Sequence, residues 1–183
     1  MKFISSLFIV CVLILLTGCK KQSSNGLPDI TQYGANTFGC LINGQVFTPG
    51  GGGGTFAPHV STLSSSYNDL QNLGFTFGIE GLNESNSCNI SSVSINFDSV
   101  LMQVRTYKLQ TIKAGQGEGF YSHVSNCNTG GYFETNDSLT GELTLTRFDS
   151  IASGTFWFNV LDQNHDTVKI TSGRFDIHVN YSN

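Results

Sequence analysis

The sequence predicts an all-β protein, an antiparallel β-sandwich or alternatively a flattened β-barrel of about nine to eleven short strands. Three observations lead to this prediction. Apolar and polar side chains alternate with a period of two along several stretches of the chain. Turn-forming residues, among them 21 glycines, separate these stretches, and 14 phenylalanines provide aromatic bulk for a core. Long amphipathic helical patterns are missing; only residues 64–73 are expected to form one short helical turn.

The chain opens with Lys2 and an apolar run that ends in Leu16-Thr17-Gly18-Cys19. A run of this length is typical of a signal peptide. The segment resembles the lipobox of bacterial lipoproteins. The resemblance implies that residues 1–18 are cleaved off and that Cys19 carries a diacylglycerol and an N-terminal acyl chain such as palmitate. The alternatives are an ordinary signal peptide with a coincidental cysteine and an uncleaved membrane helix.

Residues 19–35 are polar and lack apolar periodicity, so we expect a lipid-anchored flexible tether in front of one β-domain, residues 36–183. The predicted partner of the anchor is a membrane of the cell envelope. By resemblance to other lipoproteins, Lys20 after the anchor cysteine implies the outer membrane, while the face of that membrane stays open. With 12% charged residues and a net charge of −4, the composition argues against nucleic-acid binding.

The first hairpin of the domain is predicted at Asn43-Gly44, which stands between two apolar runs. A two-residue turn there pairs Cys40 with Phe47 and Leu41 with Val46. Phe38, Cys40, Ile42 and Phe47 then share the core face. The five glycines 50–54 are interpreted as a loop and not as a phosphate loop, because no Lys-Ser/Thr pair follows them.

Later strands repeat the alternation. Four groups of bulky residues each take one face of a strand: Phe75, Phe77 and Ile79; Val93, Ile95 and Phe97; Phe156, Phe158 and Val160; Phe175, Ile177 and Val179. Towards the end of the chain, four strands of an antiparallel meander are predicted: 141–149, 153–162, 166–171 and 173–181.

Two stretches, "GANTFGCLINGQVF" at the start of the domain and "GELTLTRFDSIASGTFWFNV…VKITSGRFDI" near its end, together resemble an uncharacterised family of small Bacteroidota lipoproteins. That family has a β-sandwich-like domain of unknown function. The resemblance covers both ends of the domain and fades in the middle. It implies architecture, and it brings no catalytic residue to this chain.

Three cysteines remain after the anchor, in an oxidising compartment. Cys88 and Cys127 lie in polar, turn-like settings, whereas Cys40 lies in an apolar strand. We therefore predict a Cys88–Cys127 disulfide, worth roughly 4 kcal/mol in the chain-entropy model, with Cys40 as a buried free thiol. The alternative is that all three thiols are free.

No metal site or cofactor is predicted. The histidines, His59, His123, His165 and His178, have no metal-ligand spacing. Asp162, Asn164 and Asp166 begin like a calcium loop, but Thr167 and Gly173 stand where the turn glycine and the bidentate glutamate are needed. A hairpin loop is the better interpretation of this segment.

Half of the eight aspartates precede Ser or Thr and an aliphatic residue. This pattern resembles the acceptor of Bacteroidota protein O-glycosylation. The resemblance implies modification at one or more of four hydroxyls: Ser99, Ser138, Ser150 and Thr167. The alternative is that Asp-Ser is simply common where strands end.

The leading functional hypothesis is a non-enzymatic domain that binds a glycan or a protein, or that has a structural envelope role. Trp157 points away from Phe156 and Phe158, so it is expected on the outer face of its sheet as a ligand-binding residue, unless a loop or the tether covers it while Asn159 satisfies its N–H. Three tyrosines are candidates to lie near it: Tyr107, Tyr121 and Tyr132. The alternative hypothesis is an envelope enzyme that acts on glycans or peptidoglycan through dispersed carboxylates: Glu80, Asp98, Glu134 and Asp176.

Overall fold

The computed structural model describes residues 26–51, 62–69, 74–86 and 88–182, so the predicted signal peptide, Cys19 and the first part of the tether lie outside the described residues. Within this range the protein is all-β, as predicted. Its thirteen strands are β1 (Thr37–Ile42), β2 (Gln45–Phe47), β3 (Gly50–Gly51), β4 (Leu63–Asp69), β5 (Phe75–Asn86), β6 (Asn89–Asp98), β7 (Thr106–Leu109), β8 (Gln116–Ser125), β9 (Thr129–Glu134), β10 (Gly141–Phe148), β11 (Ile151–Leu161), β12 (Thr167–His178) and β13 (Tyr181–Ser182). No helix among these residues is long and apolar enough to cross a membrane.

The strands form one continuous, strongly curled sheet of half-barrel shape. Its hydrogen-bonded order is β13-β4-β5-β6-β8-β7-β10-β11-β12-β1-β2, with β3 beside β5 and β9 beside β8. Three pairs are parallel, namely β13 with β4, β3 with β5 and β7 with β8. The sheet is therefore mixed, and not antiparallel throughout as the sequence analysis expected.

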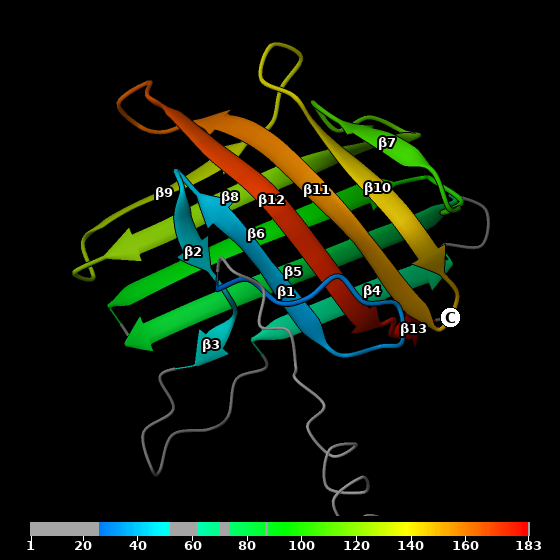
Figure 1. The fold of residues 1–183 in the computed structure, drawn as a ribbon. Coiled ribbons are helices and arrows are strands. Elements are labelled where there is room, and N and C mark those ends of the chain that lie inside the picture. Colours follow the sequence, from blue (N-terminus) through cyan, green and yellow to red (C-terminus); the bar gives the residue numbers. More distant parts are fainter. Residues whose placement is uncertain (1–25, 52–61, 70–73, 87, 183) are drawn as a thin grey trace, which may run out of the picture.

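The curl brings two parts of the sheet face to face. We call β4, β5, β6, β8 and β9 the first half-sheet, and β7, β10, β11, β12, β1 and β2 the second half-sheet. In Figure 1 the strands of the second half-sheet cross diagonally in front of those of the first. The core lies between them, and Phe77, Ile95, Phe158 and Ile177 are each at most 1% exposed. The predicted core faces of these strands are thus confirmed.

The predicted hairpin at Asn43-Gly44 is confirmed in its register. Cys40 pairs with Phe47 and Leu41 with Val46. Asn43 and Gly44 both have positive φ angles, 49° and 82°, which is the backbone that a tight hairpin turn requires. Phe38, Cys40 and Phe47 are buried in the core, and Ile42 packs against it half-buried.

Two local predictions are corrected. Residues 64–73 were expected to form a helical turn, but Leu63–Asp69 is strand β4, in which Ser65 and Tyr67 are buried while Ser64 and Ser66 are exposed. Residues 70–73 lie outside the described ranges. The segments 166–171 and 173–181 were predicted as two strands, but β12 runs unbroken from Thr167 to His178. Ser172 adopts a φ of 53° and forms a bulge opposite Trp157, so the strand bends without ending.

Residues 26–35 were assigned to the flexible tether, yet they pack on the domain. Leu27 is buried, and the carbonyl of Pro28 accepts a hydrogen bond from Arg174 at 3.3 Å. Further along, Thr31 and the backbone of residues 33–35 bond to the carboxylate of Asp176. The folded unit therefore includes residues before position 36.

Candidate functional site

Trp157 lies on the outer face of the second half-sheet, in the middle of β11. Its neighbours Phe156 and Phe158 point into the core, so alternation directs the indole outward. The side chain is 40% exposed. Its Nε1–H donates to Glu142 Oε2 at 3.4 Å, so the partner of the indole is Glu142 and not Asn159. The described residues thus leave a large part of the indole accessible to a ligand.

A shallow hollow of about 260 Å³ lies beside Trp157. It is lined by residues of three adjacent strands: Glu142, Thr144, Thr155, Phe156, Trp157, Ser172, Gly173 and Arg174. The strand register places Glu142 directly opposite Trp157 and aligns Thr144, Thr155 and Arg174 in the next row. An aromatic ring, a carboxylate, a guanidinium and three hydroxyls therefore line one hollow on three hydrogen-bonded strands. This set matches the planar and hydroxyl-binding groups that a sugar requires.

The structure does not bring the three predicted tyrosines to Trp157. Tyr107 is only 6% exposed and points into the core, where its hydroxyl bonds to the backbone of Gln103. Tyr121 faces inward on β8 and stacks on His123, with ring centres 5.6 Å apart. Tyr132 is 69% exposed, but it belongs to β9 in the first half-sheet. Sequence alternation placed each residue on a face, but it could not show which strands are neighbours.

A second candidate surface surrounds Tyr132 on the outer face of the first half-sheet. We call Glu80, Glu118, Phe120, Tyr132 and Glu134 the Tyr132 surface. The rings of Phe120 and Tyr132 lie 5.3 Å apart, and strand register sets Glu134 opposite Phe120. A hollow of about 290 Å³ adjoins it, lined by β4, β5 and β6 together with Tyr132: Ser64, Ser65, Ser66, Gly78, Ile79, Glu80, Ser94 and Asn96.

Glu118 was not predicted as a site residue. It pairs with Asn96, so its side chain points to the outer face, yet it is only 7% exposed. Burial first, and then the negative charge of Glu134, raises the pKa of Glu118 to about 7. The sequence signal was a lone glutamate between Gly117 and Gly119 in a strand, but its burial depends on how neighbouring segments pack.

The dispersed carboxylates of the enzyme hypothesis converge only in part. Glu80 and Glu134 both lie near Tyr132, whose pKa is raised by burial and then by the charges of Glu80, Glu118 and Glu134. Asp98 ends β6 opposite Gln116, and its charge is not among those that raise the pKa of Tyr132. Asp176 has no exposed surface, and its carboxylate accepts hydrogen bonds from Ser153 and from residues 31–35. This carboxylate therefore connects segments of the fold.

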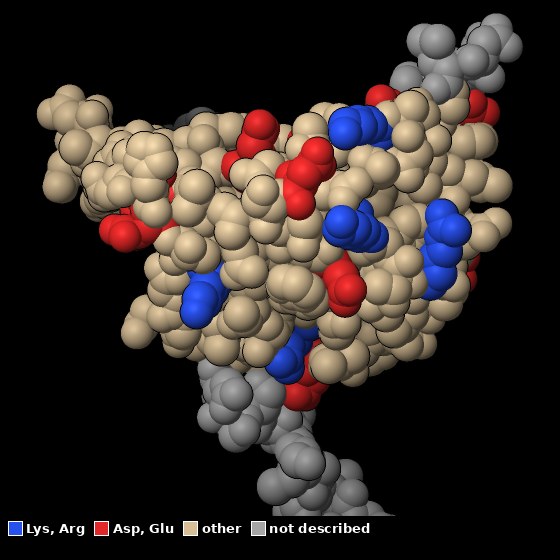
Figure 2. Space-filling view, turned by 90° about the horizontal axis from the view of Figure 1, so that it is seen from above, with Lys and Arg blue, Asp and Glu red and all other residues tan. Residues whose placement is uncertain are grey.

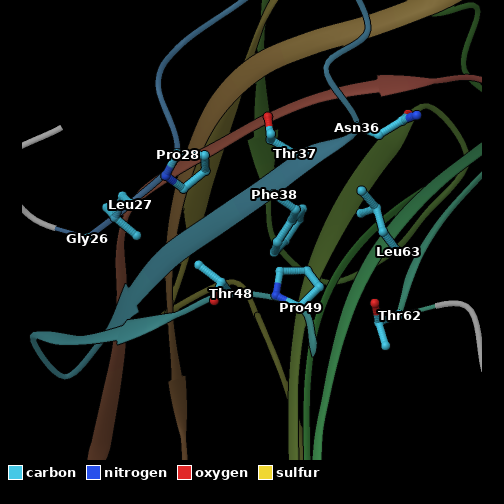
Figure 3. A pocket seen from close by; sticks show the side chains of 10 residues that line it. All are labelled: Gly26, Leu27, Pro28, Asn36, Thr37, Phe38, Thr48, Pro49, Thr62 and Leu63. Atoms are coloured by element: carbon cyan, nitrogen blue, oxygen red, sulfur yellow. The ribbon is translucent and has the colours of Figure 1, made fainter. Parts of the chain in front are cut away.

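The hollow in Figure 3, of about 380 Å³, lies where β1 approaches the start of β4. Its lining mixes apolar and polar side chains, and the ring of Phe38 lies next to Pro49. The hydroxyl of Thr37, which also lines it, is buried and has no hydrogen-bond partner among the described residues.

Cys88 and Cys127 form a disulfide, the pairing proposed from the sequence. It links the turn between β5 and β6 to the turn between β8 and β9, with Cα atoms 4.3 Å apart. Cys40 is a free, buried thiol, and burial raises its pKa to about 12. A thiol in that state is a poor nucleophile.

The four hydroxyls of the Asp-Ser/Thr pattern lie at strand ends or in connections. Ser138, Ser150 and Thr167 are exposed, whereas Ser99 is half-buried after β6. The accompanying aspartates also serve the turns: Asp149 accepts a backbone hydrogen bond from Ile151 and pairs with Arg147. Three of the four hydroxyls are therefore accessible for modification. The same positions also fit the alternative that Asp-Ser pairs simply occur where strands end.

The segment that begins like a calcium loop is the hairpin between β11 and β12. Asp162 Oδ1 accepts hydrogen bonds from the backbone N–H groups of Asn164 and Asp166, at 2.8 and 2.9 Å. Within the described part of the chain, no group of three or more His, Cys, Asp or Glu residues is placed to hold a metal ion. His59 lies outside the described residues.

Comparison with known proteins gives no relative: the chain matches no protein-family model, no curated protein and no solved structure.

Proposed function

We propose that this protein is an envelope lipoprotein, anchored to the outer membrane through Cys19, whose β-domain binds a glycan without catalysing a reaction. The observation that carries the binding proposal is the exposed indole of Trp157 beside a polar hollow on three paired strands. A sugar ring can stack on the indole while Glu142 and Arg174 bond its hydroxyls. Strands hold these groups in place before the ligand arrives, which reduces the entropy lost on binding.

The Trp157→Ala variant tests this proposal. We expect loss of retention on immobilised envelope glycans with little change in the melting temperature, because an exposed side chain contributes little to the core. Leu161→Ala is the matched control, since Leu161 is exposed to a similar extent on the same strand, 37% against 40%. Equal retention by both variants would contradict glycan binding at Trp157. Loss of several kcal/mol of stability would assign the indole to packing instead.

A glycan-acting enzyme is the second candidate, and one observation favours it. Glu118 has a raised pKa and lies near Glu134, which is the kind of acid and carboxylate pair that glycosidases use. As a general acid, Glu118 must be protonated, so activity should fall as the pH rises above about 7.

The measurement for this candidate is the release of soluble fragments from purified peptidoglycan by the full-length chain across pH 5 to 9. Glu118→Gln should abolish the release, and Glu84→Gln on β5 serves as the charge-matched control. If the unmodified protein releases nothing at any pH, the enzymatic hypothesis is wrong.

A further inference from the structure

The strand next to Trp157 carries a bulge at the hollow. The pairing of β12 with β11 skips residues 171–172, and its pairing with β1 skips residues 172–173, so Ser172 pairs in neither ladder. Ser172 also has a φ of 53°, which is unusual for a residue other than glycine. A bulge of this kind redirects the side chains around it, and both Ser172 and Arg174 line the hollow.

The bulge orients the guanidinium of Arg174. Its Nε–H donates to the carbonyl of Ser172 at 3.3 Å, and its Nη1 donates to the carbonyl of Pro28 at 3.3 Å. Both acceptors are neutral backbone groups, and among the described residues Arg174 forms no ion pair. Arg147 differs, because it pairs with Asp149 at 2.9 Å. A guanidinium has more N–H groups than the bonds of Arg174 use, so donors remain for an anionic ligand.

The carboxylate that lines the hollow, Glu142, lies at its other end. Glu142 belongs to β10 and Arg174 to β12, with β11 between them, so their backbones are roughly 10 Å apart. Glu142 accepts the indole N–H of Trp157 and pairs in register with Lys108 on β7. A ligand that lies across β11 therefore meets a cation at one end, the indole and Thr155 in the middle, and an acceptor at the other end.

Charge on the molecular surface does not favour a polyanion. On the face that Figure 2 shows, positive and negative side chains are interspersed among uncharged residues. The chain also has a net charge of −4, which repels a polyanion. A single guanidinium in a hollow instead suits a small ligand with one negative group.

We propose that the Trp157 hollow binds an acidic sugar, a uronic acid. Its carboxylate pairs with Arg174, its ring stacks on the exposed indole, and its hydroxyls bond to Thr155 and Glu142. This class is favoured over neutral sugars because a neutral sugar leaves the charge of the guanidinium uncompensated. The specificity rests on the glycan binding proposed above, to which it adds the class of sugar.

Trp157 is the only tryptophan of the chain, so its fluorescence reports ligands at this hollow. The experiment titrates the full-length protein in detergent micelles with glucuronic acid, glucose or acetate. We expect a saturable change with glucuronic acid, with an affinity at least about fivefold higher than for glucose or acetate. The preference for glucuronic acid should shrink as salt increases, because salt screens the charge pair.

Variants of the two arginines separate a specific contact from general attraction. Arg174→Gln should abolish the preference, so that glucuronic acid and glucose bind alike. Arg174→Lys keeps the charge but loses the fork of N–H groups, so it should weaken glucuronic acid binding about threefold. Arg147→Gln is the matched control, because Arg147 also donates to a carbonyl of the N-terminal segment, that of Gln32, but does not line the hollow. It should change the affinity less than about twofold.

Contrary outcomes are specific. Equal affinities of the parent protein for glucuronic acid and glucose overturn the specificity and leave the glycan proposal standing. Acetate binding as tight as that of glucuronic acid shows an anion contact without sugar recognition, and it also overturns the specificity. Equal weakening by Arg174→Gln and Arg147→Gln shows diffuse attraction and has the same consequence. If Arg174→Gln does not fold, unchanged glucuronic acid affinity in Arg174→Lys overturns the specificity. A response to neither sugar contradicts the glycan proposal as well.

Discussion

Asp176 joins two distant parts of the chain through its polar contacts. Its carboxylate has no exposed surface, and it accepts hydrogen bonds from Thr31, Ser153 and the backbone of residues 33–35. Burial alone raises the pKa of this group, but the bonds from Ser153, Thr31 and the backbone outweigh it and lower the pKa to about 2. The carboxylate thus fastens the N-terminal segment to β12.

This arrangement predicts a defined acid sensitivity. Because the folded pKa of Asp176 lies below its ordinary 3.8, its stabilisation is present above about pH 4 and is lost as the pH falls towards 2. The amount is up to about 2.5 kcal/mol. Asp176→Asn should remove this pH dependence and lower stability at pH 7, because its amide N–H groups face other donors. Urea unfolding at pH 2 to 7 measures both effects.

Asp137→Asn is the control for that experiment, since Asp137 is exposed and forms an exposed ion pair with Lys113. It should change stability by less than about 0.5 kcal/mol. If the free energy of unfolding of Asp176→Asn falls between pH 4 and pH 2 as much as that of the parent, then other groups cause the acid sensitivity.

At the scale of strands, the two half-sheets pack closely where β8 meets β11. Gly119 on β8 has no side chain, and the ring of Phe158 occupies that space: a Cβ at Gly119 would lie 2.7 Å from it. Phe158 is fully buried, so its ring has no free direction in which to move. The glycine is needed here for the close approach of two layers.

Gly119→Ala should therefore destabilise the protein by about 1–3 kcal/mol, the usual cost of overpacking a core. Adding Phe158→Leu should recover part of this loss, since the smaller side chain makes room. Gly50→Ala is the control, because its nearest atom would be Asn83 Nδ2 at an ordinary 3.4 Å. Thermal or denaturant unfolding measures each variant, and equal stability of Gly119→Ala and the parent would contradict this packing account.

At the scale of the whole molecule, the N-terminal segment connects the proposed lipid anchor to the strand that borders the Trp157 hollow. The chain enters the domain through residues 26–35, which Asp176 and Arg174 hold against β12. The Trp157 hollow also includes Arg174. A lipid on Cys19 would therefore keep the Trp157 hollow close to the membrane, at the end of a tether shorter than residues 19–35.

Cys19→Ser tests the anchor. The variant should lose its lipid and appear in the soluble envelope fraction of the cells, because the thiol is the only group that can form the thioether. Labelling with palmitate followed by membrane fractionation measures this. Cys40→Ser is the control, since a buried core thiol should have no part in anchoring. Membrane retention and labelling of Cys19→Ser would contradict the lipoprotein proposal.

The sequence alone determined the local features of this fold. Alternation assigned Phe77, Ile95, Phe158 and Ile177 to the core, because inward and outward positions follow directly from the pleat of a strand. The Asn43-Gly44 turn determined the register of its hairpin, because its two positive φ angles suit few other residue pairs. Both properties depend on neighbours along the chain.

Only the tertiary structure decided which distant segments meet. The parallel pairing of β7 with β8, the burial of Tyr107 and the separation of Tyr132 from Trp157 all follow from how the sheet curls. Residues 26–35 lack apolar periodicity and were expected to be free, yet the acceptor that orders them, Asp176, is more than 140 positions away. Such contacts leave no local pattern, because they are selected by the packing of the whole sheet.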